Sequence, residues 1–153
     1  MRILISTGLL ILLCSTVVRG QFETSKDTLG QQMVGVLAAT YLYQSYMNFG
    51  FLADGFEGEL YSTADALDYC ADLIAVVGGA RDELQAYRSA QVLEADRAFI
   101  QDLVTIADVL LQEGVALQAY IQSGARADAE RYQEFNELAR QAIQQLLGVE
   151  GLE

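Results

Sequence analysis

Proline is absent from all 153 residues of this chain, so the strongest helix breaker is missing. Over long segments, apolar residues recur every three or four positions, which is typical of an amphipathic helix and not of a strand. The clearest such segment runs from Leu93 to Ser123 and places Asp102, Asp108 and Glu113 on its outer face. Its predicted buried stripe comprises Ile100, Leu103, Ala107, Leu110, Gly114, Leu117 and Ile121.

An earlier helical segment is predicted from Asp27 to Ala53, with Thr24 and Asp27 forming a capping box at its start. Its predicted buried stripe comprises Met33, Val36, Leu37, Thr40, Tyr43, Met47 and Phe51.

A further helix is predicted to start near Ser62, whose pairing with Asp65 again fits a capping box. Gly78-Gly79 allows a kink, a close helix contact or a break, but the apolar pattern resumes at Leu84 and favours continuation to about Arg88. Leu67, Cys70, Ile74 and Val77 are expected to face inward.

The last predicted helix runs from Ala125 to Leu147, with Ser123 as its cap and Gly148 as its terminator. Its expected buried face comprises Ala129, Tyr132, Phe135, Ala139, Ile143 and Leu146. Since short joints make successive helices antiparallel, the four segments predict an all-α fold, an antiparallel up-down-up-down four-helix bundle.

The N-terminal segment Met1–Gly20 has the features of a secretory signal peptide. Arg2 supplies a positive start, a short apolar run follows, and cleavage would leave Gln21 as the new N-terminus. Two alternatives are an uncleaved membrane anchor, for which the run is short, and lipidation of Cys14, which lacks the small preceding residue that lipoprotein signals prefer. We therefore expect a secreted or periplasmic protein in which residues 21–153 form one helical domain and no further segment spans a membrane.

The chain is strongly acidic, with 21 Asp and Glu residues against 9 Lys and Arg residues, a formal net charge of −12. Removal of Arg2 and Arg19 with the leader would make the charge more negative still. Such a field disfavours nucleic acid, whose phosphates need basic contacts, and is compatible with a basic protein partner or with solubility alone.

The chain also contains no histidine, which removes the usual ligands of carboxylate-bridged metal bundles and of haem bundles. Serine nucleophiles therefore have no imidazole base, and no metal site or cofactor is predicted. After leader cleavage Cys70 would be the lone cysteine, either buried and inert or linking two copies; helix packing is a second route to a homodimer. An enzyme is therefore not expected.

Two groups of residues stand out as candidate surfaces. The first is a run of acids around the second predicted helix, explained either as a solvated face or as a docking patch. It comprises Asp54, Glu57, Glu59, Asp65, Asp68 and Asp72. The second is an aromatic cluster at the end of the first predicted helix, explained either as a plug for the end of the bundle or as a ligand pocket or patch. Its candidate residues are Tyr43, Met47, Phe49, Phe51 and Phe56.

These features predict a non-enzymatic helical bundle that binds a partner protein or joins an extracellular or envelope assembly. The alternative is a bundle that binds a small apolar ligand, in a pocket lined by Tyr43, Met47, Phe51 and the residues facing them.

Overall fold

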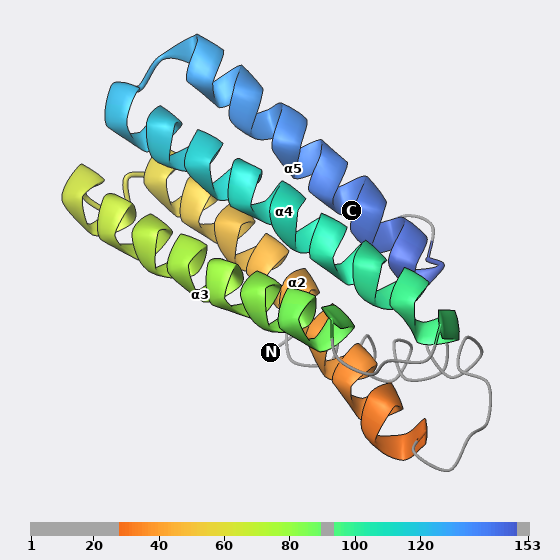
Figure 1. Cartoon of the computed structure of the whole chain (residues 1–153). Helices are drawn as coiled ribbons and strands as arrows, with labels where there is room; N and C mark the ends of the chain where they lie inside the picture. The colour runs from red at the N-terminus through yellow and green to blue at the C-terminus, as the bar shows by residue number, and fades with distance from the viewer. Residues whose placement is uncertain (1–27, 90–93, 150–153) are drawn as a thin grey trace, which may run out of the picture.

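A computed structural model describes residues 28–89 and 94–149, and within these ranges the chain forms four α-helices that pack as an antiparallel bundle (Figure 1). The helices are α2 (Thr28–Glu57), α3 (Thr63–Ser89), α4 (Glu94–Ser123) and α5 (Arg126–Leu147). Their up-down-up-down order confirms the fold predicted from the sequence. The predicted leader, Cys14 and the Thr24–Asp27 capping box lie outside the described residues.

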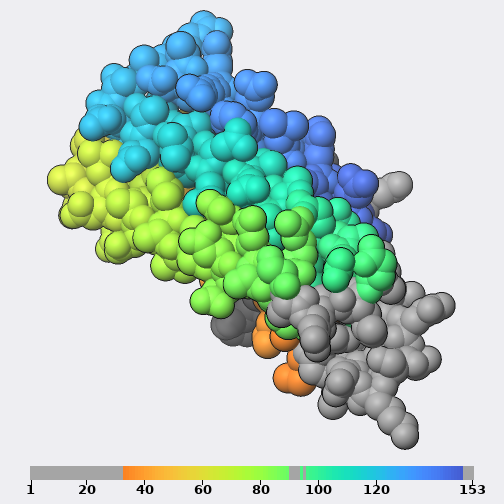
Figure 2. Space-filling view, in the orientation of Figure 1, coloured from red at the N-terminus to blue at the C-terminus, as the bar shows by residue number. Residues whose placement is uncertain are grey.

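The bundle is built around α4, which packs extensively against both α3 and α5 and also contacts α2. In Figure 2, α3, α4 and α5 lie side by side on one face of the molecule, and the ribbon in Figure 1 shows most of α2 behind them. Because α4 has three neighbours, its buried arc is wider than the stripe of a helix that packs on one side only. All seven residues predicted for its stripe, from Ile100 to Ile121, are buried or nearly so.

The ends of the helices follow from local hydrogen bonds. The Asp65 backbone N–H donates to Ser62 Oγ at 3.2 Å, which confirms the predicted cap of α3. Gly148 ends α5 in the left-handed conformation at φ 63°, as predicted. Ser123 does not cap α5. The N-cap is Ala125, and Ser123 instead accepts from its backbone N–H at 3.0 Å.

The Gly78-Gly79 pair does not interrupt α3, which continues to Ser89. The inward face predicted for this helix is also found: Cys70 and Val77 are fully buried, and Leu67 and Ile74 pack partly buried against the core.

The buried face predicted for α2 is wrong. Met33, Leu37 and Phe51 were expected inside, but their exposed fractions are 57%, 63% and 59%. The core face lies on the opposite side of the helix and comprises Ala39, Leu42, Phe49, Leu52 and Ala53. Apolar residues occupy both sides of α2, so periodicity alone could not choose between them.

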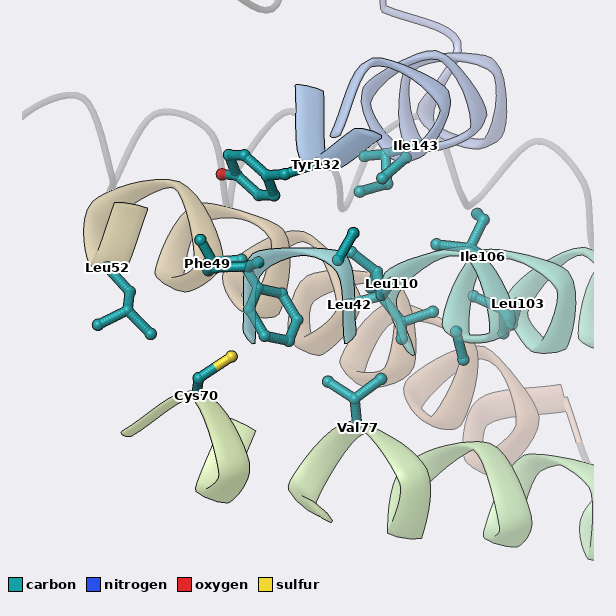
Figure 3. Packing of buried hydrophobic residues seen from close by; sticks show 14 of the residues in the cluster. Leu42, Phe49, Leu52, Cys70, Val77, Leu103, Ile106, Leu110, Tyr132 and Ile143 are labelled. Carbon is teal, nitrogen blue, oxygen red and sulfur yellow. The ribbon is translucent and has the colours of Figure 1, made fainter. Parts of the chain in front are cut away.

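The packing of Phe49 explains why this side of α2, and not the predicted one, is buried. Its ring enters the centre of the bundle near Cys70 (Figure 3) and is fully buried. A Cβ on Gly114 of α4 would lie 2.8 Å from Phe49 Cζ and 2.7 Å from Ile74 Cγ1. The missing side chain at Gly114 therefore makes the space that the Phe49 ring fills, which draws α2 onto α4.

Candidate functional site

A groove of about 460 Å³ runs between α2 and α5. Its volume lies in the range of small-molecule sites. Gly50 faces this open space, since a Cβ built there meets no atom within 4 Å. The lack of a side chain at Gly50 therefore helps to keep the groove open. The lining residues are Tyr43, Tyr46, Met47, Gly50, Phe51, Ala53, Asp54 and Glu57 from α2, and Tyr132, Gln133 and Asn136 from α5.

The groove brings together three of the five aromatic-cluster candidates, Tyr43, Met47 and Phe51. The other two lie elsewhere. Phe49 is in the core, and Phe56 packs edge-to-face against Tyr120, with ring centroids 5.8 Å apart. The wall from α5 was not predicted from the sequence, since only the antiparallel packing of distant segments places Tyr132 and Asn136 opposite α2.

A fully buried carboxyl group, Glu113 of α4, lies behind the groove wall. Its Oε1 accepts a hydrogen bond of 2.7 Å from Asn136 Nδ2, and its Oε2 is buried without a hydrogen-bond partner. Burial raises the pKa of Glu113 to about 8, and the bond from Asn136 offsets only part of that rise. The outward position predicted for Glu113 is therefore wrong, because α4 packs against α2 and α5 as well as α3 and its buried arc extends to this residue.

Two tyrosines of the groove are electrostatically coupled to this carboxyl group. Burial raises the pKa of Tyr132, and the charges of Glu113 and Asp54 raise it further. Burial, followed by Glu113, raises the pKa of Tyr46 as well. Tyr132 extends from α5 toward α2 (Figure 3). Because its pKa is about 8, Glu113 is mostly protonated at neutral pH, and the negative charge of the groove comes from Asp54 and Glu57. The described lining contains no Lys or Arg, although the positive charge of Arg140 acts on Tyr46.

The acidic-patch candidates are all exposed, but they do not form one uniform surface. Asp54 and Glu57 line one end of the groove, and Glu57 Oε1 accepts from the Tyr120 hydroxyl at 3.2 Å. Glu59 has a structural role, since it ends α2 in the left-handed conformation at φ 56°. Asp65 is engaged with the Ser62 hydroxyl at 2.6 Å.

The remaining acids, Asp68 and Asp72, lie on the outer face of α3. Exposed apolar side chains lie near the N-terminal end of α3 as well. Leu60 is 78% exposed, and Tyr61 and Tyr69 stack edge-to-face on one another with centroids 5.6 Å apart.

Cys70 is enclosed in the core, and its thiol donates a hydrogen bond of 3.3 Å to the Gly114 carbonyl oxygen. Burial raises its pKa to about 11. A thiol held in this way is a poor nucleophile, and it cannot reach a second chain while the helices remain packed.

One further helix property differs from the sequence prediction. Asp96–Ser123 is long and apolar enough to cross a membrane by length and composition, although no such segment was expected. This helix is the centre of the bundle, with half of its most apolar stretch buried, as is common for a core helix. Within residues 28–89 and 94–149, no group of three or more Cys, Asp or Glu residues is arranged to hold a metal ion.

Comparison with protein-family models, with curated proteins and with solved structures finds no match to this chain.

Proposed function

We propose that this chain is an exported, non-enzymatic binding protein whose α2–α5 groove takes a small organic cation with an apolar body. The observation that carries the proposal is the composition of the groove. Aromatic rings from two helices line it, two exposed carboxylates stand at one end, and the described lining has no basic residue.

The aromatic walls suit both parts of such a ligand. Tyr43, Tyr46, Phe51 and Tyr132 offer apolar surface to a hydrocarbon body and ring faces to an ammonium group. Asp54 and Glu57 add negative charge at the entrance, which raises the local concentration of cations.

A paired ligand test separates charge from shape. The probes are benzyltrimethylammonium and its uncharged carbon isostere, neopentylbenzene, and binding is followed by chemical-shift changes of the tyrosine ring protons. We expect the cation to bind at least ~10-fold more tightly than the isostere. Equal binding would support a purely apolar pocket, and binding of neither would reject the proposal.

A matched pair of variants locates the binding. Gly50→Leu fills the groove, whereas Gly79→Leu places the same side chain on the exposed side of α3, and neither position has an atom within 4 Å of a new Cβ. We expect Gly50→Leu to weaken cation binding by at least ~10-fold and Gly79→Leu to leave it unchanged. Equal loss in both variants would place the binding outside the groove.

A second candidate function is docking of a basic protein on the outer face of α3. Its support is the exposed position of Leu60 and Tyr69 among Asp68 and Asp72, because apolar anchors within a charged rim are typical of interfaces. Affinity capture from the native compartment tests it at low and high salt. Neutralising Asp65, Asp68 and Asp72 together should slow association and flatten its salt dependence while the fold is kept.

Export is tested separately. Mass spectrometry of the protein recovered from its native compartment should show Gln21 as the first residue, and a chain that keeps Met1–Gly20 would contradict cleavage.

A further inference from the structure

The outer side of α2 has an apolar ridge that no other described helix covers. We call it the α2 ridge, and it comprises Met33, Leu37, Thr40, Gln44, Met47 and Phe51. Its three large apolar members at the ends, Met33, Leu37 and Phe51, are each more than half exposed. The core residues of α2 lie on the opposite side of the helix, so nothing in the bundle itself requires these side chains to be apolar.

The spacing along the α2 ridge alternates strictly between four and three residues, which is the repeat of a coiled-coil seam. Leu37 lies one heptad before Gln44, and Phe51 lies one heptad after it. An antiparallel second ridge would therefore place Gln44 against Gln44 and Leu37 against Phe51. Thr40 and Gln44 are the two polar residues of the ridge, and a polar residue in an apolar seam is a common means of fixing the register of two helices.

A hollow lies on each side of the ridge, one beside Phe51 and the other beside Leu37. The α2–α5 groove adjoins Phe51. On the other flank, a hollow of about 390 Å³ between α2 and α3 adjoins Leu37 and is lined by Val34, Tyr41 and Leu84 among others. In the antiparallel arrangement, Phe51 of each copy faces the α2–α3 hollow of the other, and Leu37 faces the groove. Leu37 and Phe51 of each copy would thus each meet a concave surface, as in knobs-into-holes packing.

Charge indicates which occupant fits this surface. No Asp, Glu, Lys or Arg occurs from Thr28 to Ala53, although the whole chain has a net charge of −12. Two copies repel one another over their acidic surfaces, but along the α2 ridge they can approach without placing like charges together. We propose that the α2 ridge pairs antiparallel with the α2 ridge of a second copy of this chain, centred on Gln44.

Sedimentation of the purified chain over a concentration series tests the pairing, with the N-terminus of the sample identified by mass spectrometry. We expect a reversible dimer, and Leu37→Glu should weaken it by at least ~100-fold, because the new carboxylate is buried against Phe51. Val115→Glu is the matched control, since Val115 is 56% exposed on α4, away from the ridge. It should leave the dimer intact. Circular dichroism checks that both variants are folded.

Cysteine pairing tests the register independently of stability. Under mild oxidation, Gln44→Cys should cross-link to itself, and a mixture of Leu37→Cys and Phe51→Cys should form the mixed disulfide in preference to either homotypic one. The native Cys70 is buried and does not compete. A monomer at concentrations well above micromolar, a dimer indifferent to Leu37→Glu, or homotypic Leu37→Cys pairs would overturn the proposal. Met47 and Phe51 belong to both the ridge and the groove lining. Leu37 lies outside the groove lining, so loss of the dimer in Leu37→Glu with cation binding kept would separate the two proposals.

Discussion

α4 and α2 are helices of equal length, 30 residues each, and both are rich in apolar residues, but only α4 sorts them onto one side. The stripe predicted for α4 is the stripe observed, from Ile100 to Ile121. None of the stripe predicted for α2 is fully buried: Met33, Leu37 and Phe51 are exposed, and the other four residues are half-buried. The difference shows that the periodicity of apolar residues predicts that a segment is helical. Which side of the helix is buried can be predicted only where polar residues mark the exposed side.

The largest expected loss of stability comes from the buried face of α4. Leu110 is fully buried at the centre of the bundle, among α2, α3 and α5. Leu110→Ala should lower the free energy of unfolding by ~2–5 kcal/mol, the usual cost of removing a buried leucine side chain. Urea denaturation followed by circular dichroism measures this, and a loss below ~0.5 kcal/mol would mean that the α4 face is assigned wrongly.

A glycine substitution on each helix should have opposite effects. At Gly114 of α4 a methyl group would overlap Phe49 and Ile74, so Gly114→Ala should destabilise the fold by ~1–3 kcal/mol. At Gly50 of α2 a methyl group meets open space, so Gly50→Ala should stabilise it by ~1 kcal/mol through helix propensity. If both substitutions changed the free energy of unfolding in the same direction, α2 would not pack against α4 at Gly114.

The pH dependence of stability tests whether the buried arc of α4 includes Glu113. Burial raises the pKa of Glu113 in the folded state to about 8, from its ordinary value of 4.5. The folded state therefore keeps a proton that the unfolded state releases between these pH values. The stability contributed by the protonated group is fully present below pH 4.5 and is lost as the pH rises to about 8, at a slope of ~1.4 kcal/mol per pH unit.

Glu113→Gln should remove this slope and make the protein more stable than the parent at pH 8 by up to ~5 kcal/mol, the slope acting over this interval, since the amide oxygen can still accept from Asn136. The matched control is Glu134→Gln, an exposed position on α5, which should change neither quantity. Urea denaturation at several pH values provides the comparison. An unchanged slope in Glu113→Gln would show that this carboxyl group is solvated.

The contrast between local and tertiary determinants explains how much of the fold and of the site could be predicted. The sequence was sufficient for four helices, the cap at Ser62 and the end at Gly148, because these depend on local periodicity and local hydrogen bonds. It was insufficient for Glu113, whose burial depends on how many neighbours α4 has. It was also insufficient for the groove, since Asn136 and Tyr132 meet α2 only through tertiary packing.

α2 buries the face that carries Leu42 and Phe49 and leaves its other face exposed, and both proposed surfaces depend on this orientation. The most direct test compares two leucines on this one helix, Leu42, which is 1% exposed, and Leu37, which is 63% exposed. Unfolding is measured at the lowest usable protein concentration, where a dimer contributes least. Leu42→Ala should cost ~2–5 kcal/mol and Leu37→Ala less than ~0.5 kcal/mol. Equal costs, or the larger cost at Leu37, would contradict the orientation of α2 on which both proposed surfaces depend.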